Sequence, residues 1–457
     1  MLGRRRRGLL FGLAVLSTAS RTLASGTAAY MAGSRDYPAA LPEGFHLERV
    51  VVVHRHGDRA QIARSIGPKF PEEEERAALW KTKLPSPSTV ATMASVAHST
   101  YDVTAFARTG KRDTTETTSL TLMDEVYSGE DSYSNPYAQL TEVGAQQLFK
   151  LGTELRRRYE AEGVPLNAEA IYARSTNMCR TLQSLRSLLA GLLGGSSLET
   201  PLNLHQKVKI NTRPKATEFM FPAADGPCEA MVQRRSVIFP EGFMEENLPG
   251  YPALEARMKQ ALGYEGKVSW LTVKEILTCS KVHGLAYPAG VEEEDEKQIS
   301  HLAGWMWGKL YSDAELNRLA IGRFLGEVLG DLTNAALANK SVFLYSGHDS
   351  TLVPLLCALG CHDDVWPPYA SSLALEIATS SSSGERLVRA IYNDQEVEMK
   401  AVDASGGKGR WCRYGALLDR LKEMSISEGD YREVCGLGSA ASSALPHIES
   451  EVRATIG

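Results

Sequence analysis

The sequence predicts an α/β protein: a three-layer sandwich with a mostly parallel central sheet flanked by helices, plus a smaller, largely helical cap built from insertions. Two observations predict this class. Short apolar runs typical of buried strands alternate with helical patterns, and polar residues directly follow three of those runs. In an open α/β sheet the ligand site lies beyond the carboxyl ends of the strands, so these polar residues indicate one shared site.

The first strand is predicted over Leu47–Val53, where four consecutive valines make the run β-branched. The polar segment Arg55–Arg59, with the sequence RHGDR, comes directly after it. Gly57 in that segment allows the backbone to approach a neighbour closely and to adopt unusual dihedral angles. We therefore expect Arg55–Arg59 to lie at the carboxyl end of a buried strand.

The later strands are predicted from similar short runs, over Ile171–Ala173, Ser341–Tyr345, Ser372–Ala378 and Arg386–Tyr392. Helices are predicted from apolar spacing and capping residues, over Thr141 to about Tyr159, from after Thr176 to about Leu193, and over Glu315–Ala338 and Thr351–Ala358. Arg174-Ser175-Thr176 follows the second strand, and His348-Asp349 follows the third.

Two long stretches interrupt this alternation, roughly residues 61–140 and 205–313. They lack clean strand periodicity, and we expect them to be mostly helical and loop insertions that cover the site. The predicted organisation is a targeting segment at 1–24 and a single catalytic domain over 25–457 that carries these cap insertions.

Composition excludes several classes of protein. The chain has 457 residues, 43% hydrophobic and 23% charged, which is typical of a globular protein and not of a fibrous or disordered one. Its net charge of −5 argues against a nucleic-acid binder. An anionic substrate must therefore be held by a local cluster of positive charge.

The N-terminal segment is typical of a secretory signal peptide, with Arg4–Arg7, an apolar run over Gly8–Leu16 and plausible cleavage near Ala24. A mitochondrial transit peptide is the alternative, because the segment is Arg-rich and lacks acidic residues. The apolar run is too short to span a bilayer, and no stable membrane anchor is expected. The predicted location is the secretory pathway, either extracellular or in a lysosome-like lumen.

Seven cysteines are spread along the chain without a CxxC pair. An oxidising compartment allows six of them to pair and leaves one free, whereas buried reduced cysteines are the alternative at several positions. Asn339-Lys340-Ser341 is a glycosylation sequon that is usable if the chain is secreted.

The three polar segments together supply arginine, histidine and one carboxylic acid. Arginine matches phosphate oxygens with two parallel hydrogen bonds, and each arginine at about 4 Å contributes on the order of 4 kcal/mol of attraction at an effective dielectric of 20. A neutral imidazole can attack phosphorus, and a protonated carboxyl can protonate the departing alkoxide, which suits acidic conditions. Arg180 competes with Arg174 as an anion ligand, and Arg174 is preferred because it directly follows the strand.

In these segments the sequence resembles the histidine acid phosphatases, the second branch of the histidine phosphatase superfamily. The motifs occur in the family's order: Arg55–Arg59, Leu140–Gly144, Arg174–Thr176 with Arg180-Thr181, His348-Asp349 and Pro367–Ser371. One departure is Ala60-Gln61-Ile62 where many relatives have a proline soon after the second arginine, which affects the substrate rim.

The resemblance implies a two-step mechanism without metal or cofactor. His56 would form a phosphohistidine, and Asp349 would protonate the leaving oxygen and then help water hydrolyse the intermediate. Four residues would bind the phosphoryl oxygens: Arg55, Arg59, Arg174 and His348. The sequence thus predicts an acid phosphatase that acts on small phosphate monoesters.

The substrate stays open, with lysophospholipids and sugar phosphates favoured over inositol polyphosphates. An inositol-polyphosphate phosphatase remains the alternative because residues 61–140 contain six cations: Lys69, Lys81, Lys83, Arg108, Lys111 and Arg112. A catalytically silent phospholigand-binding protein and a phosphate-transferring mutase are further alternatives. Loss of His56 or Asp349 would mark the former, and both are present.

Overall fold

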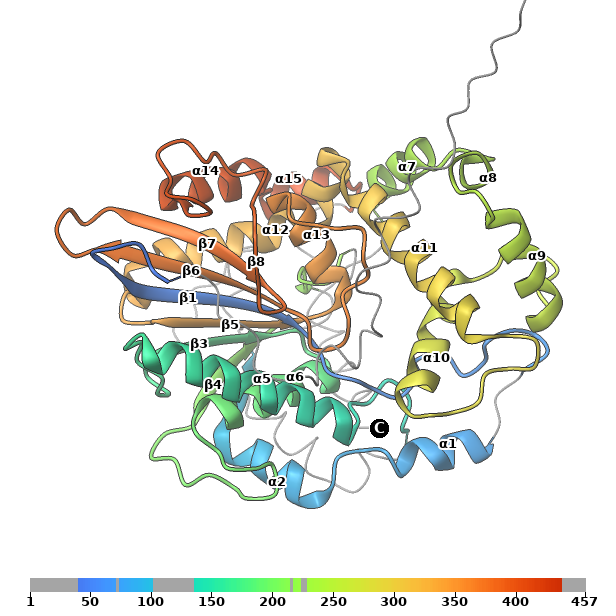
Figure 1. Ribbon diagram of the computed structural model, residues 1–457, viewed down its shortest axis with the longest axis horizontal. Coiled ribbons are helices and arrows are strands. Elements are labelled where there is room, and N and C mark those ends of the chain that lie inside the picture. The colour runs from blue at the N-terminus through green and yellow to red at the C-terminus, as the bar shows by residue number, and fades with distance from the viewer. Residues whose placement is uncertain (1–39, 71–73, 102–134, 214–216, 223–227, 438–457) are drawn as a thin grey trace, which may run out of the picture. The chain divides into compact units, whose positions relative to one another are not determined.

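A computed structural model describes residues 40–70, 74–101, 135–213, 217–222 and 228–437 of the protein (Figure 1). The targeting segment predicted at 1–24 lies outside these residues, as do Arg108, Lys111 and Arg112.

One central sheet organises the described residues, with nine strands in the order β2-β4-β3-β5-β1-β6-β7-β8 and β9 beside β7. Their bounds are β1 (Phe45–Arg55), β2 (Ala97–Tyr101), β3 (Ile171–Ser175), β4 (Val208–Thr212), β5 (Val342–Gly347), β6 (Ser372–Ser380), β7 (Arg386–Tyr392), β8 (Gln395–Val397) and β9 (Cys412–Arg413). The strands from β2 to β1 pair in parallel, and the rest pair antiparallel. All five strands predicted from the sequence are present.

The register of three neighbouring parallel strands explains why distant motifs meet. β5 lies between β1 and β3, and it pairs Gly347 with Arg55 on one side and Ser346 with Ser175 on the other. The three strands therefore end at the same edge of the sheet. The segments that follow them leave this edge together.

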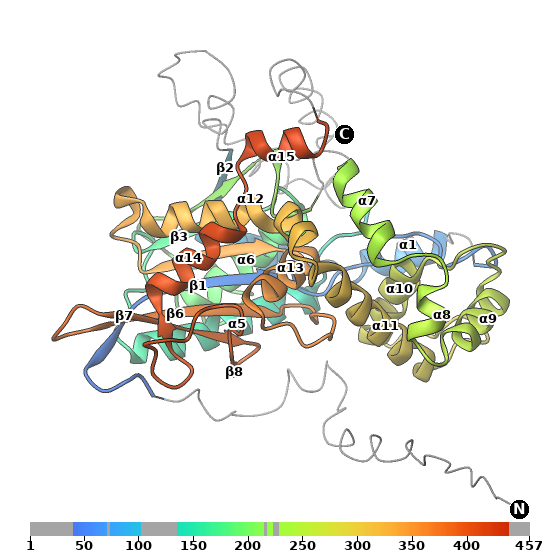
Figure 2. The same cartoon turned by 90° about the horizontal axis from the view of Figure 1, so that it is seen from above.

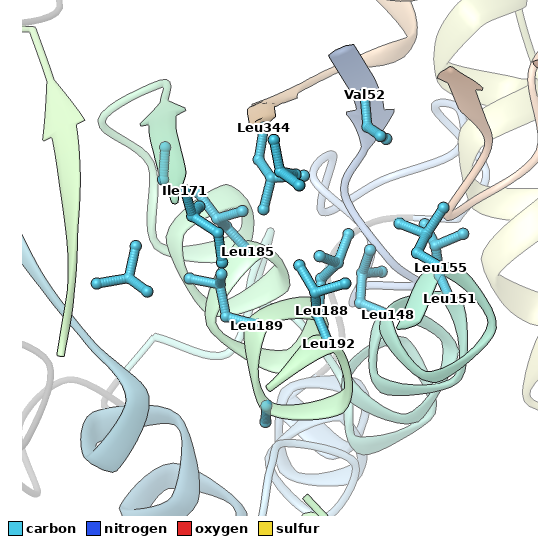
Figure 3. Close-up of a cluster of buried hydrophobic side chains, with 14 of the residues drawn as sticks. Val52, Leu148, Leu151, Leu155, Ile171, Leu185, Leu188, Leu189, Leu192 and Leu344 are labelled. Carbon is cyan, nitrogen blue, oxygen red and sulfur yellow. The ribbon is translucent and has the colours of Figure 1, made fainter. Parts of the chain in front are cut away.

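Helices cover both faces of the sheet, as the strand alternation requires. Val50 and Val52 of β1 belong to the cluster under α5 (Glu142–Ala161) and α6 (Cys179–Leu192), which Figure 3 shows. Val51 and Val53 face the opposite cluster under α12 (Ala314–Thr333), α13 (Asp349–Leu359) and α14 (Tyr414–Met424). Each fully buried valine or leucine contributes about 1.5–3 kcal/mol, so the sheet edge is held by a two-sided core.

The cap has a hydrophobic cluster of its own, built mainly from α9 (Tyr251–Leu262), α10 (Trp270–Val282) and α11 (Glu293–Tyr311). Figure 2 shows these helices grouped with α8 (Phe243–Asn247) at one end of the sheet. The remaining helices are α1 (Glu74–Lys81), α2 (Pro87–Val96), α7 (Glu229–Ile238), α15 (Glu428–Val434) and the short 3₁₀ helix Ala335–Leu337.

Some details differ from the sequence prediction. β2 and β4 lie within the stretches expected to be insertions, yet each is hydrogen-bonded into the central sheet, so only part of each stretch covers the site. The helix predicted over Glu315–Ala338 ends at Thr333, because the Asn334 side chain accepts a hydrogen bond from Ala336 N and starts a 3₁₀ turn.

Fewer cysteines form disulfides than the six that an oxidising compartment would allow to pair. One disulfide joins Cys228 before α7 to Cys435 after α15, and the other five cysteines are free. None of the described helices has the length and apolar character needed to cross a bilayer.

Candidate active site

The loop after β1 lies directly on the first turn of α5. A Cβ on Gly57 would collide with the backbone of Gly144, so glycine is needed here for close approach and not for a positive φ. Gly57 N donates to Ser184 Oγ at 3.0 Å, and Asp58 N donates to Gln147 Oε1 at 2.8 Å. Helices α5 and α6 thus fix the backbone on which His56 and Arg59 sit.

His56 is held as a neutral imidazole with one nitrogen available. Its Nδ1–H donates to the Gly57 carbonyl at 2.8 Å, which leaves the lone pair on Nε2. Burial, followed by the positive charges of Arg180 and Arg55, lowers the pKa of His56 well below 6.5. The ring therefore stays unprotonated, and nucleophilic, under acidic conditions.

Asp349 is the first residue of α13 and forms an ion pair with Arg55, with Nη2 and Oδ2 2.7 Å apart. Its other oxygen accepts a hydrogen bond from Ser350 N at 2.8 Å. Burial raises the pKa of this carboxyl, but Arg55 and Lys274 outweigh burial and lower the pKa to about 2. Without a bound ligand, Asp349 is a carboxylate.

His348 lies beside His56, with ring centroids 5.5 Å apart. Its Nε2 is 2.9 Å from Thr176 Oγ1, and its Nδ1 is 3.5 Å from Arg180 Nη2. Tyr369 completes this group: its ring contacts the Arg55 guanidinium at 4.3 Å and the Arg59 guanidinium at 5.9 Å. The structure thus brings together five of the predicted residues: Arg55, His56, Arg59, His348 and Asp349.

Arg174 is the predicted site residue that does not join this group. Its Nη2 and Nη1 donate to Glu218 at 2.8 and 3.0 Å, and its Nε donates to Glu327 on α12 at 3.1 Å. The side chain is 1% exposed. Arg174 alternates with Ala173 along β3, so it points to the sheet face that α12 covers and not out from the strand end. The structure corrects the preference for Arg174.

Arg180, in the first turn of α6, occupies the position expected of Arg174. Burial, followed by the charge of Arg59, lowers the pKa of Arg180 to about 10, because no carboxylate pairs with it among the described residues. Its buried Nε has no acceptor in that part of the chain either. A bound anion would supply the counter-charge that Arg180 lacks among the described residues.

The cap contributes side chains that the sequence analysis missed, two from one face of α10 and one from the residue that follows it. Glu275 Oε1 accepts from Arg59 Nη1 at 2.5 Å and from Ile62 N at 2.7 Å. His283, just after α10, places Nε2 2.6 Å from Asp58 Oδ2. Cys279 Sγ is 3.4 Å from the Arg59 carbonyl. Glu275, Cys279 and His283 are spaced four residues apart, and this spacing is the only sequence signal that could have identified them. The same spacing occurs in any helix with one buried face.

The balance of charge fits a phosphate group. Four cations gather here at acidic pH, from Arg55, Arg59, Arg180 and Lys274, and two of them pair with carboxylates: Arg55 with Asp349 and Arg59 with Glu275. Arg180 and Lys274 have no carboxylate partner among the described residues, and a phosphate monoester, which carries one to two negative charges near neutral pH, would supply that counter-charge. Preorganised cations around a neutral imidazole can therefore bind a phosphoryl group and stabilise its transition state.

Comparisons with known proteins agree with this chemistry. The family model described as the histidine phosphatase superfamily (branch 2) matches residues 46–393. The mouse protein named lysophosphatidic acid phosphatase type 6 is 29% identical over 421 residues, covering 85% of this chain and 88% of the relative. Human prostatic acid phosphatase is 27% identical over 307 residues, covering 65% of this chain and 78% of the relative.

Among solved structures, the phytase of Hafnia alvei in complex with myo-inositol hexakis sulphate matches with a TM-score of 0.57. The match covers 84% of this chain and 98% of the phytase, at 14% sequence identity. At this identity the similarity concerns the fold alone.

Proposed function

Since the chain belongs to branch 2 of the histidine phosphatase superfamily and is a phosphoric monoester hydrolase of the acid phosphatase type, we propose that His56 is its nucleophile and Asp349 its proton donor. The observation that carries this proposal is the His56 ring, whose Nδ1–H is bonded to Gly57 O beside the Arg55–Asp349 ion pair. The roles of the surrounding arginines follow from the same geometry.

In the first step, His56 Nε2 attacks phosphorus and the bond from phosphorus to the ester oxygen breaks. The leaving oxygen takes a proton from Asp349, and the phosphoryl group stays on His56. Arg55, Arg59, Arg180 and His348 bind the phosphoryl oxygens, where charge accumulates in the transition state. Arg180 takes this role in place of Arg174, which Glu218 and Glu327 hold.

Asp349 must gain its proton when substrate binds, because its pKa is about 2 in the free site. A bound phosphate group places negative charge beside the carboxylate and offsets the field of Arg55, which raises the pKa of Asp349. Below about pH 6 the monoester itself carries a proton that it can transfer to the carboxylate. In the second step, water attacks phosphorus, Asp349 accepts the water proton, and phosphate leaves neutral His56.

The test is the His56→Ala variant with p-nitrophenyl phosphate as substrate at pH 5. We expect kcat/KM to fall by roughly four orders of magnitude or more, as it does when other enzymes lose a nucleophile. His301→Ala is the matched control, because His301 is exposed on cap helix α11. Retention of more than a tenth of the wild-type rate by folded His56→Ala protein would remove His56 from the mechanism.

A lysophospholipid is the substrate we propose to test first, because the mouse relative's name contains lysophosphatidic acid. The half-buried rings of Trp307 and Trp366, 4.5 Å apart, support an apolar surface next to the site. The rates of phosphate release from lysophosphatidate, a sugar phosphate and phytate identify the substrate class. Fastest release from phytate would favour the inositol-polyphosphate alternative.

We also propose that the chain enters the secretory pathway. The Cys228–Cys435 disulfide supports an oxidising compartment, and Asn339 of the sequon is exposed between the 3₁₀ helix and β5. The names of the lysosomal and prostatic relatives agree with this location. A mobility shift on removal of N-linked glycans from protein secreted by eukaryotic cells is the expected result.

A further inference from the structure

Lys274 is a buried cation that the mechanism above does not use. It lies on α10 of the cap, and the residue is only 6% exposed. Its Nζ lies 4.3 Å from the centre of the Trp366 ring, and it has no hydrogen bond or ion pair with any described residue. An ammonium carries three donors, and those of Lys274 are therefore available to an oxygen acceptor on a ligand.

The Trp366 ring, over which the Lys274 ammonium lies, packs against the Trp307 ring of cap helix α11, with ring centroids 4.5 Å apart. The loop that carries Trp366 lies directly on cap helix α11, because Gly304 and Gly308 have no side chains there. A Cβ on Gly304 would lie 2.7 Å from Trp366 N. The backbone of this loop is therefore packed directly against the cap.

The same loop places Lys274 beside the proton donor. Pro367, the next residue after Trp366, accepts a hydrogen bond from Arg55 Nη1 at 2.7 Å, and Arg55 binds Asp349. The charged groups that face Lys274 are Arg55, Arg59 and Asp349, with the Cys279 thiol nearby on α10. Burial and then Arg55 lower the pKa of Lys274 to about 7, so it is an ammonium at acidic pH.

The proposed role of Asp349 places the leaving oxygen at its carboxyl group, so a cation that faces Asp349 lies where it can reach the leaving alcohol. We propose that Lys274 is a substrate-binding residue that donates a hydrogen bond to a hydroxyl of the leaving alcohol on the carbon next to the ester carbon. The site then favours monophosphates of glycerol and similar polyols over phosphates of simple alcohols. This inference rests on the proposed roles of His56 and Asp349.

The experiment compares Lys274→Met with the wild type on two substrates that share a three-carbon skeleton. Glycerol 3-phosphate has the neighbouring hydroxyl, whereas n-propyl phosphate lacks it. We expect Lys274→Met to lose about ten-fold more kcat/KM on glycerol 3-phosphate than on n-propyl phosphate, the size of one hydrogen bond to a charged group. Lys267→Met, which removes an exposed cap lysine just before α10, should show no such difference.

Other outcomes overturn the inference. Equal losses on both substrates would mean that Lys274 acts on the phosphoryl group or on the fold. A larger loss on n-propyl phosphate, whose alcohol is the poorer leaving group, would mean that Lys274 assists proton transfer. If the wild type hydrolyses neither these esters nor p-nitrophenyl phosphate, the proposed function fails instead. Thermal unfolding of both variants checks that they are folded.

Discussion

The carboxyl edge of the sheet and the facing surface of cap helix α10 contribute to the site in different ways. The sheet edge supplies the groups that handle the phosphoryl group, and each sits where a strand ends or a helix begins. Helix α10 supplies Glu275, Cys279 and Lys274 from its middle, where they contact the arginines or lie next to them. The groups proposed to act on the phosphoryl group thus come from the sheet edge, whereas one face of α10 supplies groups that position the arginines or bind the rest of the substrate.

This difference has a physical origin. At the ends of parallel strands the backbone turns away, and side chains there meet at one edge whatever their distance in sequence. A helix face can be directed at such an edge only by tertiary packing, here by the cluster that holds α10 against α9 and α11. Changes at the edge should therefore affect the chemical step, whereas changes on α10 should affect substrate selection or the placement of arginines.

The largest effect expected at the sheet edge is that of Asp349→Asn. The substitution removes the proton donor but keeps an oxygen that can accept from Ser350 N. We expect kcat on glycerol 3-phosphate to fall by about 10²–10⁴-fold, the usual contribution of general acid–base catalysis. The loss on p-nitrophenyl phosphate should be smaller, because nitrophenolate departs without a proton.

Asp363→Asn is the matched control, since Asp363 is an exposed aspartate on the loop after α13. Equal losses on the two substrates would deny Asp349 the role of acid and leave it as the partner that orients Arg55.

The sequence could predict most of the sheet edge but little of α10. β-branched runs followed by RHGDR and by His348-Asp349 indicate both the strands and their ends. The sequence favoured Arg174 over Arg180, and the structure reverses this preference, because the choice depends on which sheet face α12 covers. Lys274, Glu275 and His283 lie in a stretch without a motif, and only the packed cap shows that they face the edge.

Substitution of the two arginines separates catalysis from stability at the same edge. Arg180→Ala should lower kcat/KM for p-nitrophenyl phosphate by about 10²–10³-fold, as loss of a transition-state donor does, with little change in the free energy of unfolding. Arg174→Ala leaves buried Glu218 without its cation and Glu327 with Arg213 alone, 3.6 Å away, which should cost about 3–5 kcal/mol of unfolding free energy.

Urea unfolding and steady-state kinetics on the Arg180→Ala and Arg174→Ala variants test these two predictions. A folded Arg174→Ala protein with the greater loss of kcat/KM would return Arg174 to the phosphate-binding set and overturn the assignment of Arg180.

The smallest effect expected is that of Glu275→Ala on α10, and it tests whether the cap reaches the chemistry through Arg59. Without Glu275 Oε1, the Arg59 guanidinium loses the acceptor 2.5 Å from Nη1 and can leave the phosphate site. We expect kcat/KM to fall by about ten-fold, mainly through a higher KM, the size of one charged hydrogen bond. Glu275→Gln keeps an oxygen acceptor and should recover most of the loss.

Glu294→Ala, which removes an exposed carboxylate from α11, is the control for a change of charge in the cap. If kcat/KM of Glu275→Gln is no higher than that of Glu275→Ala, Glu275 does not act as the hydrogen-bond acceptor for Arg59. If Glu275→Ala lowers the melting temperature and leaves KM unchanged, α10 only supports the fold. Recovery by glutamine combined with an unchanged melting temperature would instead mean that a cap helix sets the geometry of a phosphate ligand on the sheet edge.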